Sequence, residues 1–545
     1  MKKKYFFVNL LWTIGFLSCH NNVDELIPKE REKTQTHFYF DAVNGSDDNP
    51  GDTPEKPFKS LLMLNYFKVE AGDSIFLAKG VRHQGAIKLK NIVASKEKPV
   101  VITSFGDGSE RATIDAKGNL AAIYMENCSF IEVSNLEITA DGSGGISDKD
   151  ARTEKMRCGV LYKVNSVSTY ENIKLQNLYI HHVFIEEKGY QRDPDEVNTA
   201  NGNEQYGWGI RFINEIGSSL KNIEIKDCIV ENVSHTGIKF SGKKFNISDS
   251  SVSGCTVQYV GGPGIQMSGV QNIHVHHNVV DHSGFEGDES RNWGRGSGYW
   301  CWGSDRILVE HNYFTNAHGP NDSAGAHIDY NCSNVIYQYN FSANNYGGFC
   351  EILGNNYNCC YRYNISVNDG ARSTPNLGAT LFISGYTGGK NTGPFNSYVY
   401  NNTIYTGSSN KSSIAITRTA DGLYIANNIF YISGRTQAFL NDQFQGPANN
   451  AIMKNNLFLN TSSWNSRNHL KDSDPKYGDP SFANPGGLGV EDYIPSAADV
   501  VKDKGIALEK LPGDEIGLYL GLEVKKDILG NLIKGNPDFG AIEMQ

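Results

Sequence analysis

Short segments in which apolar and polar residues alternate recur along the chain, and each ends at a turn. The period of two predicts β-strands with one buried face, and no long amphipathic helical stretch stands out. Recurrence of one such unit along a chain is typical of a solenoid, in which each repeat packs on its neighbours. The first set of these segments comprises residues 172–177, 222–227, 272–278, 306–312, 334–340, 358–364 and 422–428.

A second set of strands follows the first, and each of its members begins with glycine. The first and third residues after the glycine are mostly apolar, so we expect them to point inward. These inward columns are Ile210, Ile238, Ile265, Tyr299, Ala326, Gly348 and Phe212, Phe240, Met267, Cys301, Ile328, Cys350. The second and fourth residues then point out to solvent. These outward columns are Arg211, Lys239, Gln266, Trp300, His327, Phe349 and Ile213, Ser241, Ser268, Trp302, Asp329, Glu351.

Asn or Asp closes each segment of the first set. An Asn at the same turn of successive coils can stack its amide on the next, which satisfies backbone groups that the turn leaves unpaired. We therefore predict an amide ladder. Its members would be Asn177, Asp227, Asn278, Asn312, Asn340, Asn364 and Asn428.

The chain resembles the pectin-lyase-like superfamily of right-handed parallel β-helix proteins that process polysaccharides. Besides the repeats, the resemblance lies in the entry segments 38–51 and 57–61 and the exit segments 527–530 and 538–543. It implies an all-β, single-domain right-handed parallel β-helix over residues 37–545, with a closing segment at its C-terminal end.

The outward columns carry the candidate binding residues. Outward tryptophans expose a large apolar area, which a soluble protein normally avoids unless a ligand covers it. Sugar rings are suitable ligands because their C–H faces stack on indole. Trp300 and Trp302 could instead lie under loop 282–296, which carries Trp293, Arg291 and Arg295. The predicted substrate-binding residues are Trp300, Trp302, His327, Gln266, Lys239 and Arg211.

The cations among these residues leave several interpretations open. Arg211 and Lys239 would bind a carboxylate or sulfate, supply the base of an eliminase, or be ordinary solvated charges. His327 would tune Asp329, bind a sugar hydroxyl, or be an ordinary solvated histidine. Secondary candidates with weaker registration are His235, Arg362 and Arg372.

Three acids form the candidate catalytic set. Asp329 and Glu351 occupy one outward column on adjacent coils, so their carboxyls should lie close together and differ in pKa. Asp322 lies on the turn before Asp329. Glycosidases need such a pair, because one carboxyl protonates the leaving oxygen while the other attacks or activates water.

The resemblance sharpens this set. Polygalacturonase-like hydrolases carry acids on successive coils, as Asp329 and Glu351 stand, and lacto-N-biosidase-like β-helix hydrolases pair two Asp seven residues apart, as Asp322 and Asp329 are. The chain lacks the Asn-Thr-Asp and Gly-His-Gly motifs of polygalacturonases, so that activity is not implied. Individual roles for the three acids stay open.

The predicted function is a glycoside hydrolase that cleaves a polysaccharide or oligosaccharide without metal or cofactor. One alternative is a polysaccharide lyase acting on a uronate-containing glycan, for which the resemblance implies calcium. A second is a non-catalytic glycan-binding surface protein.

The N-terminal region is typical of an export signal. Three lysines at 2–4 precede an apolar stretch at 5–16, and Phe16-Leu17-Ser18-Cys19 resembles the lipobox of bacterial lipoproteins. We expect a signal peptide over 1–18, a lipid on Cys19 and a polar tether over 19–36. The chain would then be an exported lipoprotein of the outer membrane or cell surface, with the periplasm as an alternative.

Composition adds two constraints. The net charge of −10 is mild for 545 residues and argues against nucleic acid as a partner. Beyond Cys19, nine cysteines remain without CxxC or zinc-like spacing, so most should be small buried residues. We expect a monomer.

Overall fold

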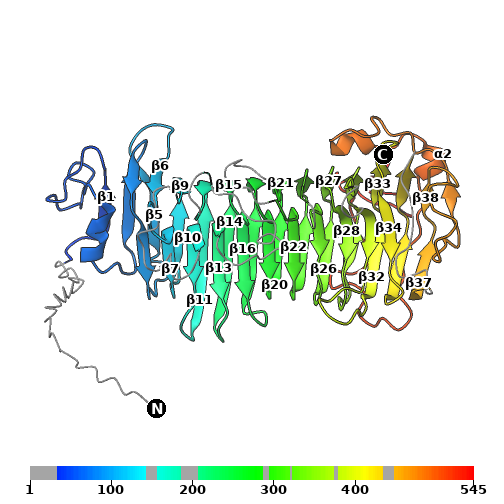
Figure 1. Cartoon of the computed structure of the whole chain (residues 1–545), viewed down its shortest axis with the longest axis horizontal. Helices are drawn as coiled ribbons and strands as arrows, with labels where there is room; N and C mark the ends of the chain where they lie inside the picture. Colours follow the sequence, from blue (N-terminus) through cyan, green and yellow to red (C-terminus); the bar gives the residue numbers. More distant parts are fainter. Residues whose placement is uncertain are drawn as a thin grey trace, which may run out of the picture.

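The computed structural model describes residues 33–142, 156–185, 189, 206–285, 294–319, 322–372, 378–433 and 447–545. The predicted signal peptide and the tether up to residue 32 lie outside this part of the chain. From the rest of the predicted tether, Lys33 contacts the domain, with its Nζ 2.6 Å from Asp73 Oδ2. The described chain winds into a long coil whose strands run across the long axis (Figure 1).

Three parallel sheets run the length of the coil over the described residues, and we call them sheets A, B and C. In order, sheet A contains β1 (His37–Phe40), β2 (Ser74–Ala78), β5 (Val100–Phe105), β8 (Ile131–Ser134), β11 (Thr169–Gln176), β14 (Ser219–Lys226), β17 (Ile247–Ser253), β20 (Gln271–His276), β23 (Asp305–Glu310), β26 (Ser333–Gln338), β29 (Cys360–Arg362), β32 (Phe395–Tyr400), β35 (Asp421–Ala426) and β37 (Asn449–Lys454).

Sheet B contains β3 (Arg82–Gln84), β6 (Ala112–Asp115), β9 (Leu136–Ala140), β12 (Tyr179–Val183), β15 (Ile229–Val233), β18 (Thr256–Val260), β21 (Val279–Ser283), β24 (Tyr313–Thr315), β27 (Phe341–Ala343), β30 (Ile365–Val367), β33 (Thr403–Thr406), β36 (Ile429–Ile432), β38 (Leu457–Phe458) and β39 (Lys476–Tyr477). Sheet C contains β4 (Ile87–Lys90), β7 (Ala121–Glu126), β10 (Met156–Lys163), β13 (Tyr206–Asn214), β16 (Ile238–Gly242), β19 (Ile265–Ser268), β22 (Tyr299–Trp302), β25 (Ala326–Ile328), β28 (Gly348–Ile352), β31 (Ala379–Ile383) and β34 (Ser413–Ile416).

Most coils therefore give one strand to each sheet, and strands of successive coils pair in parallel. This architecture confirms the predicted parallel β-helix. The inward column is also confirmed, because its members pair in one register and have no exposed surface. That column runs Ile210, Ile238, Ile265, Tyr299 and Ala326.

The predicted register fails at one coil. Ile328 pairs with Ile352, so Glu351 stands beside His327 and not beside Asp329. Phe349, predicted to point out, is buried at 2% exposure and packs edge-on against Tyr361. The cause is the pair Gly347-Gly348. A Cβ on Gly347 would lie 2.0 Å from the Asp322 carbonyl oxygen, and Gly348 takes φ +139, so this backbone path requires glycine.

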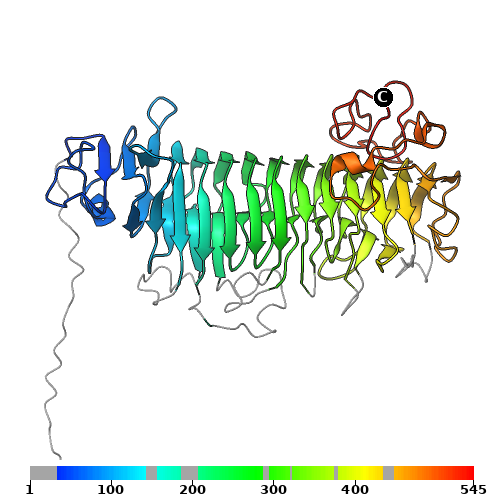
Figure 2. The same cartoon turned by 90° about the horizontal axis from the view of Figure 1, so that it is seen from above.

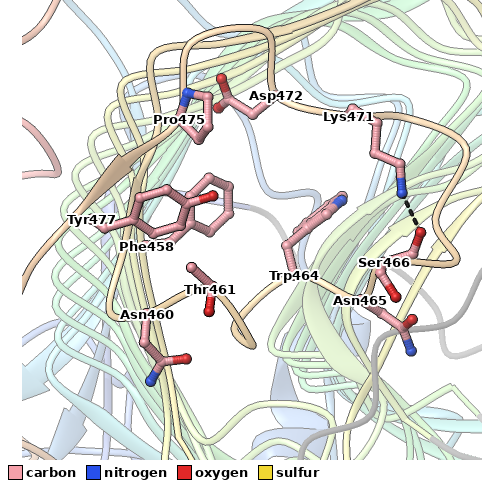
Figure 3. A pocket seen from close by; sticks show the side chains of 10 residues that line it. All are labelled: Phe458, Asn460, Thr461, Trp464, Asn465, Ser466, Lys471, Asp472, Pro475 and Tyr477. Carbon is pink, nitrogen blue, oxygen red and sulfur yellow. Dashed lines mark hydrogen bonds between the residues drawn. The ribbon is translucent and has the colours of Figure 1, made fainter.

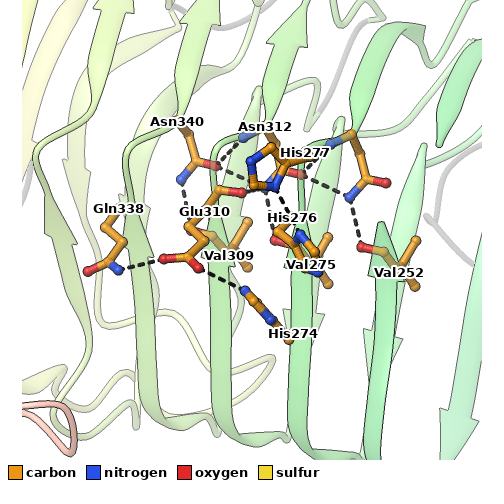
Figure 4. Close-up of polar contacts among 11 residues, drawn as sticks. Val252, His274, Val275, His276, His277, Val309, Glu310, Asn312, Gln338 and Asn340 are labelled. Carbon is orange, nitrogen blue, oxygen red and sulfur yellow. Dashed lines mark hydrogen bonds and ion pairs between the residues drawn. The ribbon is translucent and has the colours of Figure 1, made fainter. Parts of the chain in front are cut away.

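The amide ladder is confirmed over most of its predicted length. Each member donates from Nδ2 to Oδ1 of the next at 2.9–3.0 Å. The members are Asn278, Asn312, Asn340, Asn364, Asn402, Asn428 and Asn456, and Asp472 accepts the last bond at 2.7 Å. Figure 4 shows the turn where the ladder begins, with His274 and Gln338 both bonded to Glu310.

Two predicted ladder members are wrong. Asn177 and Asp227 take the positive-φ position of the turn, at +53 each, one residue before the ladder position. Buried Leu178 and Cys228 follow them at the ladder position itself. Asn and Asp tolerate the left-handed region, which explains why they recur at this first position of the turn.

The closing segment after β39 folds back over the outer faces of sheets A and B. It includes the short helices η4 (Val490–Tyr493) and α2 (Ala498–Val501), while η1 (Leu61–Tyr66) lies near the N-terminal end. Phe539 and Ile542 pack with Ile365 and Ile429 of sheet B. Figure 2 shows this segment, orange to red, along one side of the coil. Sheet C, which carries the candidate site, is not part of this contact.

The nine cysteines that the structure describes are all buried, as predicted for most of them, and none of these nine forms a disulfide. No helix within the described ranges is long and apolar enough to cross a membrane. Within the same ranges, no group of three or more His, Cys, Asp or Glu side chains is arranged to hold a metal ion.

Candidate active site

The three candidate acids lie together at the C-terminal edge of sheet C strands. Asp329 directly follows β25, Glu351 lies near the end of β28, and Asp322 lies in the connection that leads into β25. By register, Asp329 and Glu351 are diagonal neighbours on adjacent coils, with Cα atoms about 7–8 Å apart. The two acids are therefore close, as predicted, but not in one column.

Two arginines hold the turn that carries Asp322. Arg295 Nε donates to Asp322 Oδ2 at 2.8 Å, and Arg372 Nη1 donates to the Asp322 backbone oxygen at 3.0 Å. Asp322 and Ser323 both take positive φ, at +52 and +64, which is unusual for two consecutive residues other than glycine. The ion pair keeps a carboxylate at this turn.

Asp329 lies in a less polar setting. Burial is the main cause that raises the pKa of its carboxyl to about 7. The charge of Asp322 acts in the same direction, while the Tyr330 backbone N–H, at 2.8 Å from Oδ1, acts against it. A carboxyl with this pKa keeps a proton over part of the neutral range, which a general acid requires.

Glu351 has the same tendency. Burial raises its pKa to about 8, and the charges of Asp322 and Asp329 act in the same direction, while Arg372 opposes them. The shared influence of Asp322 on both other acids shows that the three carboxyls form one electrostatic group.

His327 and Trp300 form the wall next to the acids. Their rings stack at 5.8 Å between centroids, with 13° between planes. Burial lowers the pKa of His327 to about 4, so the ring is neutral at pH 7, and its Nδ1 lies 3.1 Å from Ser297 Oγ. Trp300 is only 6% exposed, whereas Trp302 is 37% exposed. Of the two predicted tryptophans, Trp302 therefore offers the open ring.

Arg211, Lys239 and Gln266 do not face open solvent, contrary to the expectation for their columns, because they are 1–5% exposed. The two cations pack on buried Trp208: the Arg211 guanidinium lies 4.0 Å and the Lys239 Nζ 4.9 Å from its ring centroid. The ring of Trp208 also packs against the ring of His235, with 4.1 Å between the two ring centroids. Their predicted binding role stays a prediction.

Sequence reasoning assigned no site role to Arg295 or Tyr330, and it named Arg372 only as a weak candidate. Tyr330 directly follows Asp329, and this position next to a candidate acid could have identified it as a site residue. The arginines come from other coils, 27 and 50 residues from Asp322, and no repeat position marks them.

A separate pocket of about 270 Å³ lies at the C-terminal end of the coil (Figure 3). Trp464, Tyr477 and Phe458 line it, but its two charged side chains have structural partners: Lys471 bonds the Ser466 carbonyl, and Asp472 ends the amide ladder. It lies on β38 and β39, several coils from the acids, so it is not the predicted catalytic centre.

Known proteins share this architecture. No protein-family model matches the chain. The lacto-N-biosidase of Bifidobacterium longum subsp. longum is 23% identical over 610 residues, which covers 93% of this chain and 36% of the relative. The chain thus spans little more than a third of that curated relative's length.

Solved structures agree with this similarity. The GH136 lacto-N-biosidase of Eubacterium ramulus superposes with a TM-score of 0.54 at 21% identity, covering 74% of this chain and 68% of that one. The native form of that protein gives 0.53 at 20% identity with the same coverage. The chain is a right-handed parallel β-helix similar to lacto-N-biosidases. The resemblance inferred from the repeats is therefore confirmed.

Proposed function

We propose that this protein is a glycoside hydrolase that cleaves an oligosaccharide or polysaccharide with Asp322, Asp329 and Glu351. The observation that carries the proposal is the contrast among three neighbouring carboxyls. Asp322 is ion-paired with Arg295, whereas burial raises the pKa of Asp329 and Glu351. One group thus supplies a carboxylate while another supplies a proton.

This contrast matches what glycosidic cleavage requires. The protonated carboxyl gives its proton to the glycosidic oxygen as the C–O bond breaks, and the carboxylate attacks the anomeric carbon or activates the water that does so. Neutral His327 and the open Trp302 ring stand beside the acids, where they suit a sugar hydroxyl and a sugar face. We keep the individual roles of the three acids open.

The substrate class follows from the relatives. Their name makes a lacto-N-bioside the first substrate to test, and the similarity covers 93% of this chain. Because the chain spans 36% of that relative, a wider panel of neutral and acidic glycans belongs in the same experiment.

The deciding experiment incubates the purified protein with this panel and reads both new reducing ends and the ultraviolet absorbance of unsaturated products. We expect reducing ends alone. The Asp329→Asn variant should lose at least about 100-fold in kcat while staying folded, with a melting transition as cooperative as that of the wild type. Unsaturated product would favour the lyase, and glycan binding without any product would favour a binding protein.

Azide assigns the roles of the acids. In an Ala variant of the nucleophile or base, azide takes the place of the missing carboxylate and gives a glycosyl azide whose anomeric configuration identifies the role. Asp322→Ala, Asp329→Ala and Glu351→Ala form the series. The variant that still cleaves a substrate whose leaving group needs no proton lacks the acid. In a retaining enzyme, azide gives a product of retained configuration with that variant and of inverted configuration with the nucleophile variant.

Metal independence is part of the proposal. The candidate acids are held by arginines and backbone groups, so we expect EDTA to leave turnover unchanged. Loss of activity in EDTA that calcium restores would contradict this.

We further propose that the mature chain begins at Cys19, carries a lipid there and acts as a monomer at the outer membrane or cell surface, with the periplasm as the alternative. The support is the sequence Phe16-Leu17-Ser18-Cys19 after a basic and apolar leader. Labelled palmitate should enter the wild-type chain and not the Cys19→Ala variant, and light scattering should give the mass of one chain.

A further inference from the structure

Three aromatic side chains form a continuous row beside the acids. Trp302 and Tyr330 meet edge to face at 6.0 Å and 87°, and Tyr330 meets Tyr386 in the same way at 5.9 Å and 83°. Trp302 is 37% and Tyr386 53% exposed. Large apolar rings gathered on a surface mark a place where a ligand covers them.

The row begins at a candidate catalytic acid. Tyr330 follows Asp329 in sequence and donates its backbone N–H to Asp329 Oδ1 at 2.8 Å. Asp329 in turn donates its backbone N–H to Cys301, the residue before Trp302, at 3.0 Å. The first two rings are therefore fixed relative to the acid by backbone hydrogen bonds.

The loop that carries Tyr386 is fixed as well. Gly354 donates its N–H to the Tyr386 carbonyl at 2.8 Å, and the Tyr386 N–H donates to Ser384 Oγ at 3.2 Å. Gly388 has φ +73, and a Cβ there would lie 3.2 Å from the Tyr330 hydroxyl. Glycine thus lets this loop approach Tyr330 closely and keeps the row continuous.

We propose that Trp302, Tyr330 and Tyr386 form a subsite for the part of the oligosaccharide that extends beyond the bond cleaved next to Asp329. This inference rests on the proposed function. Edge-to-face rings present alternating faces, so a bent sugar chain can stack on them through its C–H surfaces. Because the three side chains carry no charge, the occupant we infer is a neutral sugar.

The test uses Tyr386→Ala, since an exposed side chain can be removed without opening the core. Tyr386→Phe keeps the ring. Tyr477→Ala is the matched control, because Tyr477 is also 53% exposed but lies at the far end of the coil. KM and kcat are measured on the shortest cleaved substrate and on the same substrate extended by neutral sugars.

For Tyr386→Ala we expect KM on the extended substrate to rise about three- to tenfold, with kcat nearly constant and a smaller rise on the short substrate. Tyr386→Phe should restore KM, and Tyr477→Ala should leave both substrates unaffected. An equal rise on both substrates, or no rise, overturns the subsite.

Binding separates this inference from the hydrolase proposal. If wild-type protein cleaves no glycan, calorimetric titration with the extended glycans still tests the row: Tyr386-dependent binding supports the subsite while the hydrolase proposal fails. If instead Tyr386→Ala changes the sedimentation of the protein from dimer to monomer, the row is a contact between copies and the subsite is wrong.

Discussion

Arg295 and Asp322 form an ion pair in which Nε lies 2.8 Å from Oδ2. The arginine precedes β22 and the acid precedes β25, so the pair joins two successive coils at the edge of the candidate site. Asp322 needs such a partner, since it and Ser323 both take positive φ. The pair fixes the position of a carboxylate whose charge raises the pKa of the other two acids.

Replacing Arg295 by Gln should therefore lower kcat more than stability. A carboxylate that loses its orienting partner misses the geometry of attack, and we expect about a tenfold or larger fall in kcat. The melting temperature should change little because both side chains are partly exposed. Arg306→Gln, which removes an ion pair with Asp305 on sheet A, is the control. Equal kcat in the two variants would show that Asp322 needs no such support.

The activity should fall on the alkaline side of the pH–rate profile, where Asp329 and Glu351 lose their protons. Burial raises the pKa of Asp329 to about 7 and of Glu351 to about 8, so activity that needs their proton falls as the pH rises through this range. Arg372 lowers the pKa of Glu351. Removing that charge in Arg372→Gln moves the alkaline limb to higher pH if Glu351 is the acid, whereas Arg372→Lys keeps it in place.

A limb that stays fixed in Arg372→Gln would assign the proton to Asp329. Loss of the Arg372 charge cannot lower the pKa of Glu351. An alkaline limb of the pH–rate profile that moves to lower pH would therefore falsify the influence of Arg372 on Glu351.

Stability should also depend on these two carboxyls. Each has a higher pKa in the folded protein than its ordinary value of 3.8 or 4.5, so the folded state binds more protons than the unfolded state between those values and about 7–8. Their contribution is complete at low pH and is lost as the pH rises. In Glu351→Gln the side chain stays uncharged at every pH, so no buried charge forms as the pH rises. The variant should therefore be more stable than wild type at about pH 8, and the difference in stability should shrink toward about pH 4. Melting curves across this range check the sign.

The coil and its amide ladder could be predicted from sequence because both repeat. Inward Ile210, Ile238 and Ile265 recur at one position of each coil, and burial leaves them no other face. Asn278 and Asn340 were identified in the same way. Side chains alternate every second residue along a strand, and equivalent positions recur once per coil. Both periods can be recognised in the sequence alone.

The site breaks the repeat, and there the prediction was partly wrong. Alignment on Gly347 placed Glu351 beside Asp329, but Gly347-Gly348 follows a backbone path that shifts the register by two residues. Arg295 and Arg372 reach Asp322 from irregular connections, where neither period applies. The burial that raises the pKa of Glu351 also depends on contacts that no strand pattern encodes.

The ladder itself should support much of the stability of the coil. Buried Asn340 donates to the Val309 carbonyl and to Asn364 Oδ1, both at 2.9 Å, and its own Oδ1 accepts from the backbone and side chain of Asn312. In Asn340→Ala these buried groups lose their partner, which costs about 1–3 kcal/mol for each group left unsatisfied. We therefore expect a clear loss in urea unfolding, seen as a lower midpoint. Asn484→Ala, an exposed Asn bonded to Asp492, should stay close to wild type. If the two variants unfold at the same urea concentration, the ladder is a consequence of the turn and not a support for it.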